Sequence, residues 1–350
     1  MALIGTINSD VHFRNRIING DMRIDQRNAG ASVTLDGSGV YPVDRWRCDE
    51  ASDGDATGEQ VQDVPTGFVN SLKITTTTAD GSLSSNQYMA ANQFIEGFNT
   101  DDLMWGTANA KTITLSFWVR SSLTGTFAAG IDNNAGDRSY VFNYTISVAN
   151  TWEYKTVTIA GDTSGTWLTN NQRGLGLRFG LGSGTAFEGT VGSWQAGSKF
   201  SSSGAVSVIG TLNATWFITG VQLEVGSVAT PFERRPYGTE LALCQRYFWT
   251  SASVAGDQNP RISSGIAYST AATAQHAVMY PVEMRATPTI NSLSGNHIYS
   301  PVIGGKTITS VSLVGASKTG TTLSTAGSTG LTNHDNWVIF NCTLNFSAEL

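Results

Sequence analysis

The sequence has few charged residues and no long hydrophobic run. Asp, Glu, Lys and Arg together make up 14% of its 350 residues, against about 25% in an ordinary soluble domain. The formal net charge of −6 argues against a partner bound through phosphate neutralisation, which needs an excess of basic side chains. No apolar segment approaches the ~18 residues that span a bilayer. We therefore expect neither nucleic-acid binding nor membrane insertion, whereas a neutral polymer such as a polysaccharide remains open as a partner.

Cysteine is scarce as well. Cys48, Cys244 and Cys342 lie far apart, form no CxxC pair and are odd in number, so they provide no disulfide framework. We expect them to be reduced and partly buried, which favours synthesis in the cytoplasm. The amino terminus has no basic region followed by a long apolar core, so no signal peptide is predicted. A protein of this kind would leave a cell by lysis or within a particle.

The sequence also lacks the motifs of common enzymes. The four histidines, His12, His276, His297 and His334, have no metal-ligand spacing, and neither HExxH nor GxSxG occurs. Two carboxylates could meet in a fold to form a glycosidase pair, but a sequence does not set their separation. We expect a protein that is not an enzyme and that has no cofactor.

Glycine and short alternating apolar segments are abundant. The chain has 38 glycines, and apolar and polar residues alternate over 113–119, near 157–159 and over 175–179. Alternation with period two predicts strands that are buried on one face, and Gly- and Ser-rich connections separate them. Because no long helical pattern interrupts the series, the sequence predicts an all-β protein with a sandwich fold.

The segment from Trp216 to Trp249 divides the chain. Its first part predicts a strand with Phe217, Thr219, Val221 and Leu223 on the core face. Pro231 and Pro236 then predict a turn, and Thr239 is the expected N-cap of a short helix. The predicted domains are therefore an attachment arm (1–12), a β-sandwich (13–230), a joint made of a turn and a short helix (231–249), and a smaller β-rich domain (250–350). In the last domain we expect neighbouring strands at 263–269 and 274–280, and one continuous strand at 338–346.

Two motifs, at the beginning and at the end of the predicted sandwich, resemble a known family. The first is Asn-Arg-Ile-Ile-Asn-Gly-Asp-Met (15–22) with Asp-Gln-Arg (25–27) and Asp-Arg-Trp (44–46); the second is Gly-Val-Gln-Leu-Glu-Val-Gly (220–226) with Thr-Pro-Phe-Glu (230–233) and Leu-Cys-Gln-Arg-Tyr-Phe (243–248). Together they are similar to bacteriophage tail-fibre and tail-appendage proteins. The resemblance implies a jelly-roll sandwich like that of a carbohydrate-binding module, displayed on the virion tail.

The resemblance also implies partners. Fibres of this family are generally homotrimers that contact other tail proteins and a host-surface glycan, and the last domain would be the tip. Within the first motif, Asp21, Asp25, Asp44 and Arg45 fit internal ion pairs, and Trp46 fits the core. The apolar residues of the arm, Leu3, Ile4 and Ile7, would add a strand to a neighbouring protein, although a frayed terminus is an equal alternative.

Large side chains occupy the outer faces of two predicted strands. If Leu115, Phe117 and Val119 fill the core, Trp118 and Arg120 lie outside. By the same alternation Trp216 and Ile218 lie outside their strand. Three coverings of this surface compete, namely another subunit or domain, a loop of the same chain, and a glycan that stacks on the rings. We predict a subunit or domain interface.

Three other tryptophans lie in loop-like segments rich in Gly, Ser and Asn. Trp105, Trp167 and Trp194 are candidates for stacking on sugar rings, and Asn170 and Asn171 are candidates for hydrogen bonds to sugar hydroxyls. The alternative, that each indole only anchors its loop, is favoured for Trp167 by the sequence alone.

Acidic residues gather in one region of the predicted sandwich. They are Asp49, Glu50, Asp53, Asp55 and Glu59, with weaker groups at Asp101-Asp102 and at Asp132-Asn-Asn134. A structural calcium ion is one interpretation, but the spacing is not that of an EF-hand. A solvated acidic loop is the favoured alternative, so the metal content is left undetermined.

Three functions remain in competition. The first is host recognition through surface glycan, the second is a structural adaptor or decoration protein of the virion, and the third is a polysaccharide-degrading enzyme. The resemblance favours the first. Many shallow sites on one particle would give avidity from weak single contacts.

Overall fold

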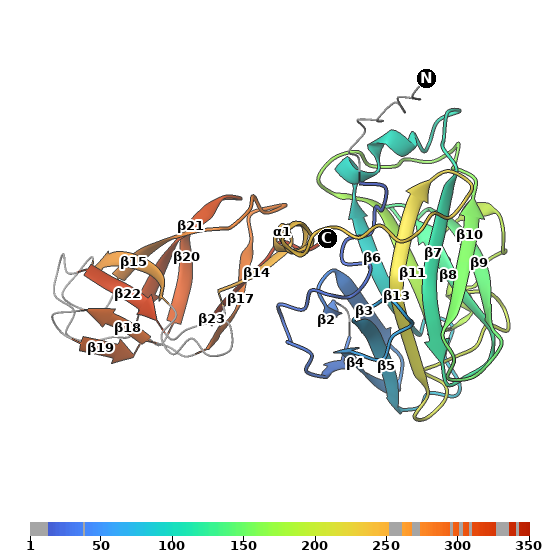
Figure 1. Cartoon of the computed structure of the whole chain (residues 1–350), viewed down its shortest axis with the longest axis horizontal. Coiled ribbons are helices and arrows are strands. Elements are labelled where there is room, and N and C mark those ends of the chain that lie inside the picture. Colours follow the sequence, from blue (N-terminus) through green and yellow to red (C-terminus); the bar gives the residue numbers. More distant parts are fainter. Residues whose placement is uncertain are drawn as a thin grey trace, which may run out of the picture. The chain divides into compact units, whose positions relative to one another are not determined.

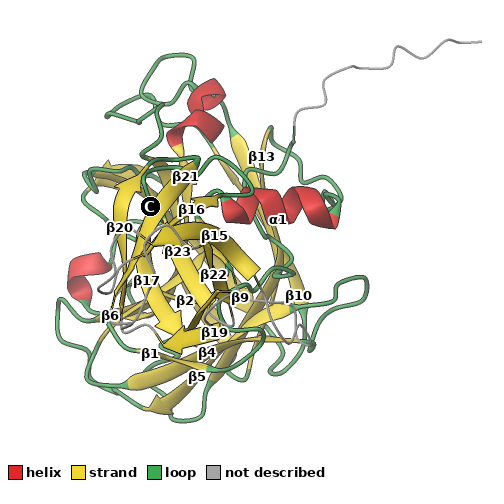
Figure 2. Ribbon diagram, turned by 90° about the vertical axis from the view of Figure 1, so that its left-hand side faces the viewer, coloured by secondary structure: helices red, strands yellow, loops and turns green. Residues whose placement is uncertain are grey.

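A computed structural model describes residues 13–37, 39–251, 261–267, 274–294, 297–300, 304–307, 310–326, 336–340 and 343–350. The chain divides into two compact units, Met1–Arg235 and Pro236–Leu350. Strands and loops make up nearly all of the described chain (Figures 1 and 2). No helix in these residues is long and apolar enough to cross a membrane. The arm residues Leu3, Ile4 and Ile7 lie outside the described residues.

The first unit contains two antiparallel sheets. Sheet A has six strands in the order β1-β4-β5-β13-β7-β10, and sheet B has seven in the order β12-β9-β8-β11-β6-β3-β2. The strands are β1 (Val33–Leu35), β2 (Val40–Val43), β3 (Trp46–Ala51), β4 (Asp55–Val61), β5 (Ser71–Thr78), β6 (Tyr88–Glu96), β7 (Ile113–Ser121), β8 (Gly125–Asp132), β9 (Arg138–Ile146), β10 (Glu153–Ile159), β11 (Arg173–Ser183), β12 (Trp194–Ala196) and β13 (Thr215–Val225). Three 3-10 helices lie between them, η1 (Gly97–Asn99), η2 (Asp101–Leu103) and η3 (Thr185–Phe187).

The two sheets enclose one core of apolar side chains. Leu115, Phe117 and Val119 of β7 are fully buried, as are Leu175, Leu177 and Phe179 of β11. Across the sandwich, the ring of Phe117 meets that of Phe179 edge to face at a centroid distance of 5.1 Å. Edge-to-face aromatic pairs add to the stabilisation that burial provides. The predicted all-β chain with a jelly-roll β-sandwich is confirmed.

The prediction that Trp216 and Ile218 lie outside is wrong, because a β-bulge interrupts β13. Both side chains are fully buried in the core, and Trp216 Nε1 donates to the Tyr144 hydroxyl at 3.2 Å. The pairing of β13 with β7 shifts between Thr219 and Gln222, where Gly220 has a φ of +62°. A bulge adds one residue to one strand and reverses the alternation beyond it. Even-numbered residues therefore point inward before the bulge, and odd-numbered ones after it.

The motifs at the two ends of the sandwich lie side by side. The backbone N–H of Arg16 donates to Leu223 O at 2.9 Å, and that of Val221 donates to Gly20 O at 2.9 Å. The side chain of Arg235 donates to the carbonyl of Ile17 at 3.1 Å. The beginning and the end of the unit are thus joined by buried hydrogen bonds, which stabilise most where no water can replace them.

The predicted internal role of the Asp-Arg-Trp motif is also seen. Arg27 pairs with Asp44 at 3.1 Å, and Trp46 is fully buried. Its indole N–H donates to Asn19 O at 3.0 Å. Arg45, with a φ of +70°, donates to Phe94 O at 2.6 Å.

The second unit contains one helix among its described residues and two sheets. The elements are α1 (Tyr237–Gln245), β14 (Phe248–Thr250), β15 (Arg261–Ala267), β16 (Ala274–Met279), β17 (Thr289–Ser294), β18 (His297–Ser300), β19 (Gly304–Thr307), β20 (Ser310–Ala316), β21 (Gly320–Ala326), β22 (Asn336–Phe340) and β23 (Thr343–Ser347). The sheets have the orders β14-β23-β17 and β19-β18-β22-β15-β16-β21-β20. The predicted neighbouring strands are β15 and β16, which pair in antiparallel.

Two local predictions for this unit need correction. The helix begins at Tyr237 rather than after Thr239, because the Pro236 carbonyl accepts from the N–H groups of Thr239 and Glu240. A proline has a fixed φ close to the helical value and suits the first turn. The predicted continuous strand over 338–346 is instead β22 and β23, which belong to different sheets. Accordingly, Ile339 of β22 and Leu344 of β23 are both buried.

Candidate functional site

Three tryptophans from separate segments of the chain form one cluster on the first unit. The centroid of Trp105 lies 4.7 Å from that of Trp167 and 5.2 Å from that of Trp194. Trp167 and Trp194 are 5.5 Å apart, and all three contacts are edge to face. Tyr140 of β9 extends the cluster, with its ring 5.2 Å from that of Trp194. We call Trp105, Trp167, Trp194 and Tyr140 the tryptophan cluster.

Each indole reaches the cluster for a local reason. Trp105 follows η2 through Met104, whose φ of +54° ends the 3-10 turn. Trp194 lies on the edge strand β12, opposite Tyr140 in the register of β9. Trp167 lies in the loop from β10 to β11, which is held by the bidentate pair of Arg138 with Asp162 at 2.7 and 2.8 Å. Such bidentate pairs fix geometry as well as charge.

All three indole N–H groups bind backbone carbonyls of the same unit. Trp105 donates to Lys111 O at 2.8 Å, Trp167 to Ser164 O at 3.2 Å and Trp194 to Ala160 O at 2.8 Å. The rings therefore anchor their loops, as the alternative interpretation of the sequence holds. Anchoring fixes the ring orientation and leaves the exposed part of a ring face free for an apolar contact.

Exposure differs within the cluster. Trp105 is buried, whereas Trp167 and Trp194 are half-buried. A cavity of about 30 Å³ is lined by Trp105 and Trp167, which is room for about one water molecule. Any larger ligand would lie on the surface, against Trp167 and Trp194.

Asn170 and Asn171 lie in the loop of Trp167. The side-chain oxygen of Asn170 accepts from the Gln172 N–H at 2.9 Å, and its carbonyl accepts from the Phe98 N–H at 3.0 Å. Asn170 thus shapes its own turn near η1, while its side chain stays exposed; Asn171 is half-buried. The structure brings the three predicted tryptophans together, which the sequence does not reveal. It also adds Tyr140, which the sequence reasoning missed. The only signal for Tyr140 is the alternation of aromatic residues at Tyr140, Phe142 and Tyr144.

The outer face of sheet A carries the other predicted residues. Trp118 is half-buried beside Tyr154, with ring centroids 5.3 Å apart. Arg120 lies over the ring of Phe217 at 4.8 Å and pairs with Asp63. Phe68 packs on Phe232 at 5.3 Å and, like Trp118, lies beside Gly220 of β13, so loops of the same chain cover part of this face. Tyr154 keeps 44% of its surface exposed.

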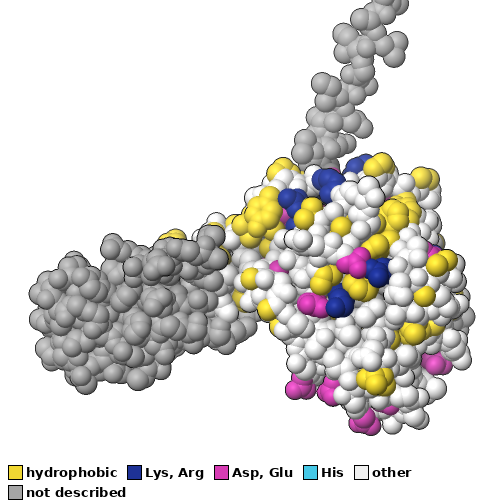
Figure 3. Space-filling view, turned by 60° about the horizontal axis from the view of Figure 1, so that its bottom comes forward, with side chains coloured by type: hydrophobic (Ala, Val, Ile, Leu, Met, Phe, Trp, Pro, Cys, Tyr) yellow, Lys and Arg dark blue, Asp and Glu magenta, His cyan; other side chains and the backbone are white. Residues whose placement is uncertain are grey.

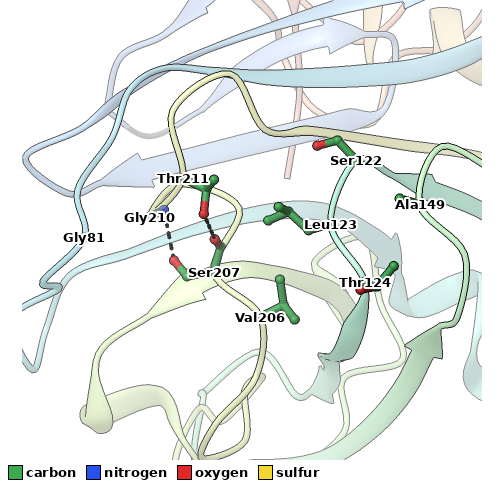
Figure 4. Close-up of a pocket in the computed structure, with 9 residues that line it drawn as sticks. All are labelled: Gly81, Ser122, Leu123, Thr124, Ala149, Val206, Ser207, Gly210 and Thr211. Carbon is green, nitrogen blue, oxygen red and sulfur yellow. Dashed lines mark hydrogen bonds between the residues drawn. The ribbon is translucent and has the colours of Figure 1, made fainter.

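A wider hollow lies elsewhere on the first unit (Figure 4). Its volume is about 540 Å³. Its lining is Gly81, Ser122, Leu123, Thr124, Ala149, Val206, Ser207, Gly210 and Thr211. These residues offer hydroxyls but no aromatic ring and no charge, and the Ser207 hydroxyl already accepts from the Gly210 N–H at 3.0 Å. The hollow therefore lacks a stacking platform.

The acidic residues do not converge. Asp49 and Glu50 are buried on β3, so the predicted solvated loop is wrong for these two, whereas Asp53 and Asp55 are exposed. Asp49 pairs with Arg47, and Glu59 pairs with Lys73. Within the described ranges no group of three or more His, Cys, Asp or Glu side chains is placed to hold a metal ion. The cysteines in those ranges, Cys48 and Cys244, are buried and not in disulfides; burial raises the thiol pKa of Cys48.

One face of the first unit has little charge. Figure 3 shows one face on which uncharged polar and backbone atoms predominate, with hydrophobic groups and a few charged side chains between them. Such a surface suits hydrogen bonds and ring stacking better than long-range attraction of ions.

Comparisons with known proteins add a likeness in fold. No protein-family model and no curated protein matches the chain. Among solved structures, a bacteriophage CBA120 tailspike domain has a TM-score of 0.32 and 14% identity over 61% of this chain and 21% of that chain. The chain thus spans about a fifth of that tailspike's length. A family 11 carbohydrate-binding module of Clostridium thermocellum has a TM-score of 0.30 and 12% identity over 58% of this chain and 99% of its own. A putative sugar-binding protein of Bacteroides thetaiotaomicron has a TM-score of 0.32 and 12% identity over 61% of this chain and 100% of its own.

Proposed function

We propose that this protein is a tail appendage of a phage virion and that its first unit binds a saccharide of the host surface. The observation that carries the proposal is the tryptophan cluster, in which two half-buried indoles, Trp167 and Trp194, are held in fixed orientation at one edge of a sandwich. Rigid ring faces stack on the apolar face of a sugar with little loss of conformational entropy. Exposed hydroxyl and amide groups of the surrounding loops would bind the sugar oxygens.

We further propose that the protein binds without catalysis. Of the carboxylates beside the cluster, Asp162 is held in an ion pair with Arg138, whereas Asp101, which lines the small cavity, is exposed. A glycosidase needs two carboxyl groups that face a common sugar bond. The test is incubation with host polysaccharide followed by measurement of reducing ends, which we expect not to increase.

The binding proposal is tested with Trp167→Ala, measured by retention on host cells and on the isolated host polysaccharide. We expect at least a tenfold loss of affinity with the melting temperature changed by only a few degrees. The matched control is Trp152→Ala, because Trp152 is also half-buried and also donates its indole N–H within the chain, to Asp63 at 3.2 Å. Wild-type affinity in the Trp167 variant would contradict the proposal.

A second candidate, an adaptor between virion proteins, is favoured by one observation. The aromatic surface formed by Trp118 and Tyr154 on sheet A suits a protein contact, because interfaces are enriched in such residues. Retention of the chain by purified virion proteins, together with no retention by host cells, would select this function.

A further inference from the structure

Three arginines meet over one phenylalanine ring on the outer face of sheet B. Arg47 of β3 and Arg178 of β11 both lie opposite Asn92 of β6, on either side of it. Two residues further along β6, on the same face of the sheet, is Phe94. The guanidinium carbons of Arg173, Arg47 and Arg178 lie 4.3, 5.4 and 5.5 Å from the centroid of its ring. We call these four residues the Phe94 cluster.

A glycine of β11, Gly176, leaves space for the arginine side chains of the cluster. Gly176 lies opposite Phe94 in the register of β11 and β6. A Cβ at this position would overlap the guanidinium of Arg173 and the carboxylate of Asp132. Glycine at this position lets the Arg173 side chain lie flat across the sheet instead of pointing into solvent. Phe200, over which Arg178 also lies at 5.6 Å, borders the cluster.

Carboxylates offset part of the positive charge of this cluster. Asp49 pairs with Arg47 at 2.7 Å, and Asp132 pairs with both Arg173 and Arg178. Two carboxylates are thus paired with the three guanidinium groups, and the buried Glu96, on the same face of β6 as Phe94, lies opposite Arg173 in the register. No acceptor for the buried Nε of Arg173 exists among the residues that the structure describes. Burial above all, and the like charges of Arg178 and Arg47, lower the pKa of Arg173, which Asp132 opposes.

The cluster is open enough to be reached by a ligand. A quarter of the Arg47 side chain is exposed, and Tyr88, on the same face of β6, is half-buried. Arg173 and Arg178 keep 13% and 14% of their side chains exposed. Charge–charge attraction is stronger at such partly desolvated positions than on an open surface.

We propose that the Phe94 cluster binds the anionic substituent, a carboxylate or a phosphate, of an acidic saccharide. This rests on the proposed function, since it extends saccharide binding to a second surface of the same unit. The planar fork of a guanidinium matches both anions through paired N–H···O contacts. The ring of Phe94 lies against the three guanidinium groups, and the anion would meet the exposed quarter of Arg47.

The experiment uses the full chain and isothermal titration with three probes. They are tetragalacturonate, the neutral oligosaccharide obtained by reducing its carboxylates, and glucose 6-phosphate. We expect tetragalacturonate to bind at least tenfold more tightly than its neutral counterpart, and to bind less tightly as salt is raised. Binding of glucose 6-phosphate as well would identify the site as one for anions of either kind, whereas binding of tetragalacturonate alone would restrict it to carboxylates. Equal binding of the acidic and neutral oligosaccharides would overturn the proposal.

Variants separate this site from the tryptophan cluster. Arg47→Gln should lose at least tenfold in affinity for tetragalacturonate, and Arg47→Lys should retain part of it. The matched control is Arg120→Gln, because Arg120 also lies over an aromatic ring and pairs with an aspartate, but on sheet A. A loss in Arg47→Gln with full binding in Trp167→Ala supports the Phe94 cluster even if the tryptophan cluster fails. Unchanged binding in Arg47→Gln, or no anionic probe bound by the wild type, overturns the inference whatever Trp167→Ala shows.

Discussion

The side-chain oxygen of Asn15 accepts a hydrogen bond of 3.0 Å from the backbone N–H of Leu223, 208 residues further along the chain. The same oxygen accepts from the Ile17 N–H, and the Asn15 amide donates to Val221 O at 3.0 Å. One buried side chain thus joins the two motifs that the sequence shows at the beginning and the end of the sandwich. The two motifs therefore share a structural role, which is to hold the beginning and the end of the sandwich together.

Replacing Asn15 by alanine should destabilise the first unit by about 2–4 kcal/mol, since three buried backbone groups, the N–H of Ile17, the N–H of Leu223 and the carbonyl of Val221, lose their partner. Chemical denaturation followed by tryptophan fluorescence measures the change. Asn134→Ala is the control, because Asn134 is exposed, and it should change stability by less than about 0.5 kcal/mol. Equal effects of the two substitutions would contradict the role given to Asn15.

The second prediction concerns Gly220, the glycine in the bulge of β13. Gly220 has a φ of +62°, and a Cβ there would meet the ring of Phe68. Gly220→Ala should therefore cost about 2–3 kcal/mol, from backbone strain and from displacement of Phe68. Gly192→Ala isolates the first cause, because Gly192 has a φ of +84° with nothing within 4 Å of its Cβ position, and should cost about 1 kcal/mol. A smaller loss for Gly220 than for Gly192 would show that Phe68 yields easily.

The same bulge shows where sequence reasoning succeeds and where it stops. Alternation correctly predicts the buried faces of β7 and β11, because a strand has a period of two and one face meets the core. Alternation fails at Trp216 because the pairing shifts at Gly220, and nothing in the sequence distinguishes this glycine from the others among the 38. Trp105, Trp167 and Trp194 are recognisable singly, but their contact depends on the positions of three distant segments, of which that of Trp194 is the edge strand β12. The Phe94 cluster is less visible still, since Arg47 and Arg178 meet only through the pairing of β3, β6 and β11.

The second unit should lose stability in mild acid through His276. This side chain on β16 is fully buried, and neither of its ring nitrogens has a partner among the described residues. Burial lowers its pKa to about 4 from the usual 6.5. Below pH 6.5 the unfolded chain takes up a proton on His276 that the folded unit excludes, and this favours unfolding. The stability of the folded unit is therefore undiminished by His276 above pH 6.5 and decreases as the pH falls towards 4.

The loss amounts to roughly 3 kcal/mol over that interval, at 1.36 kcal/mol per pKa unit. Calorimetry of the full chain between pH 4.5 and 7.5 measures it as a fall in the melting temperature of one transition. His276→Leu has a side chain of similar volume that cannot titrate, so the melting temperature of the second unit should depend less on pH in this variant. A variant with the same pH dependence as the wild type would assign the acid sensitivity to other groups.

The outer face of sheet A makes the last prediction, which concerns assembly. We expect the chain to form a homotrimer and Trp118 to lie in the contact between subunits, because a half-buried indole beside the exposed ring of Tyr154 gains from burial against a partner. Mass measurement by light scattering should give a trimer for the wild type and smaller species for Trp118→Ala. Trp167→Ala is the control on a different surface and should keep the mass of the wild type. A monomeric wild type would refute the trimer, and a trimer unaffected by Trp118→Ala would place the contact elsewhere and leave the cover of Trp118 to the loop that carries Phe68.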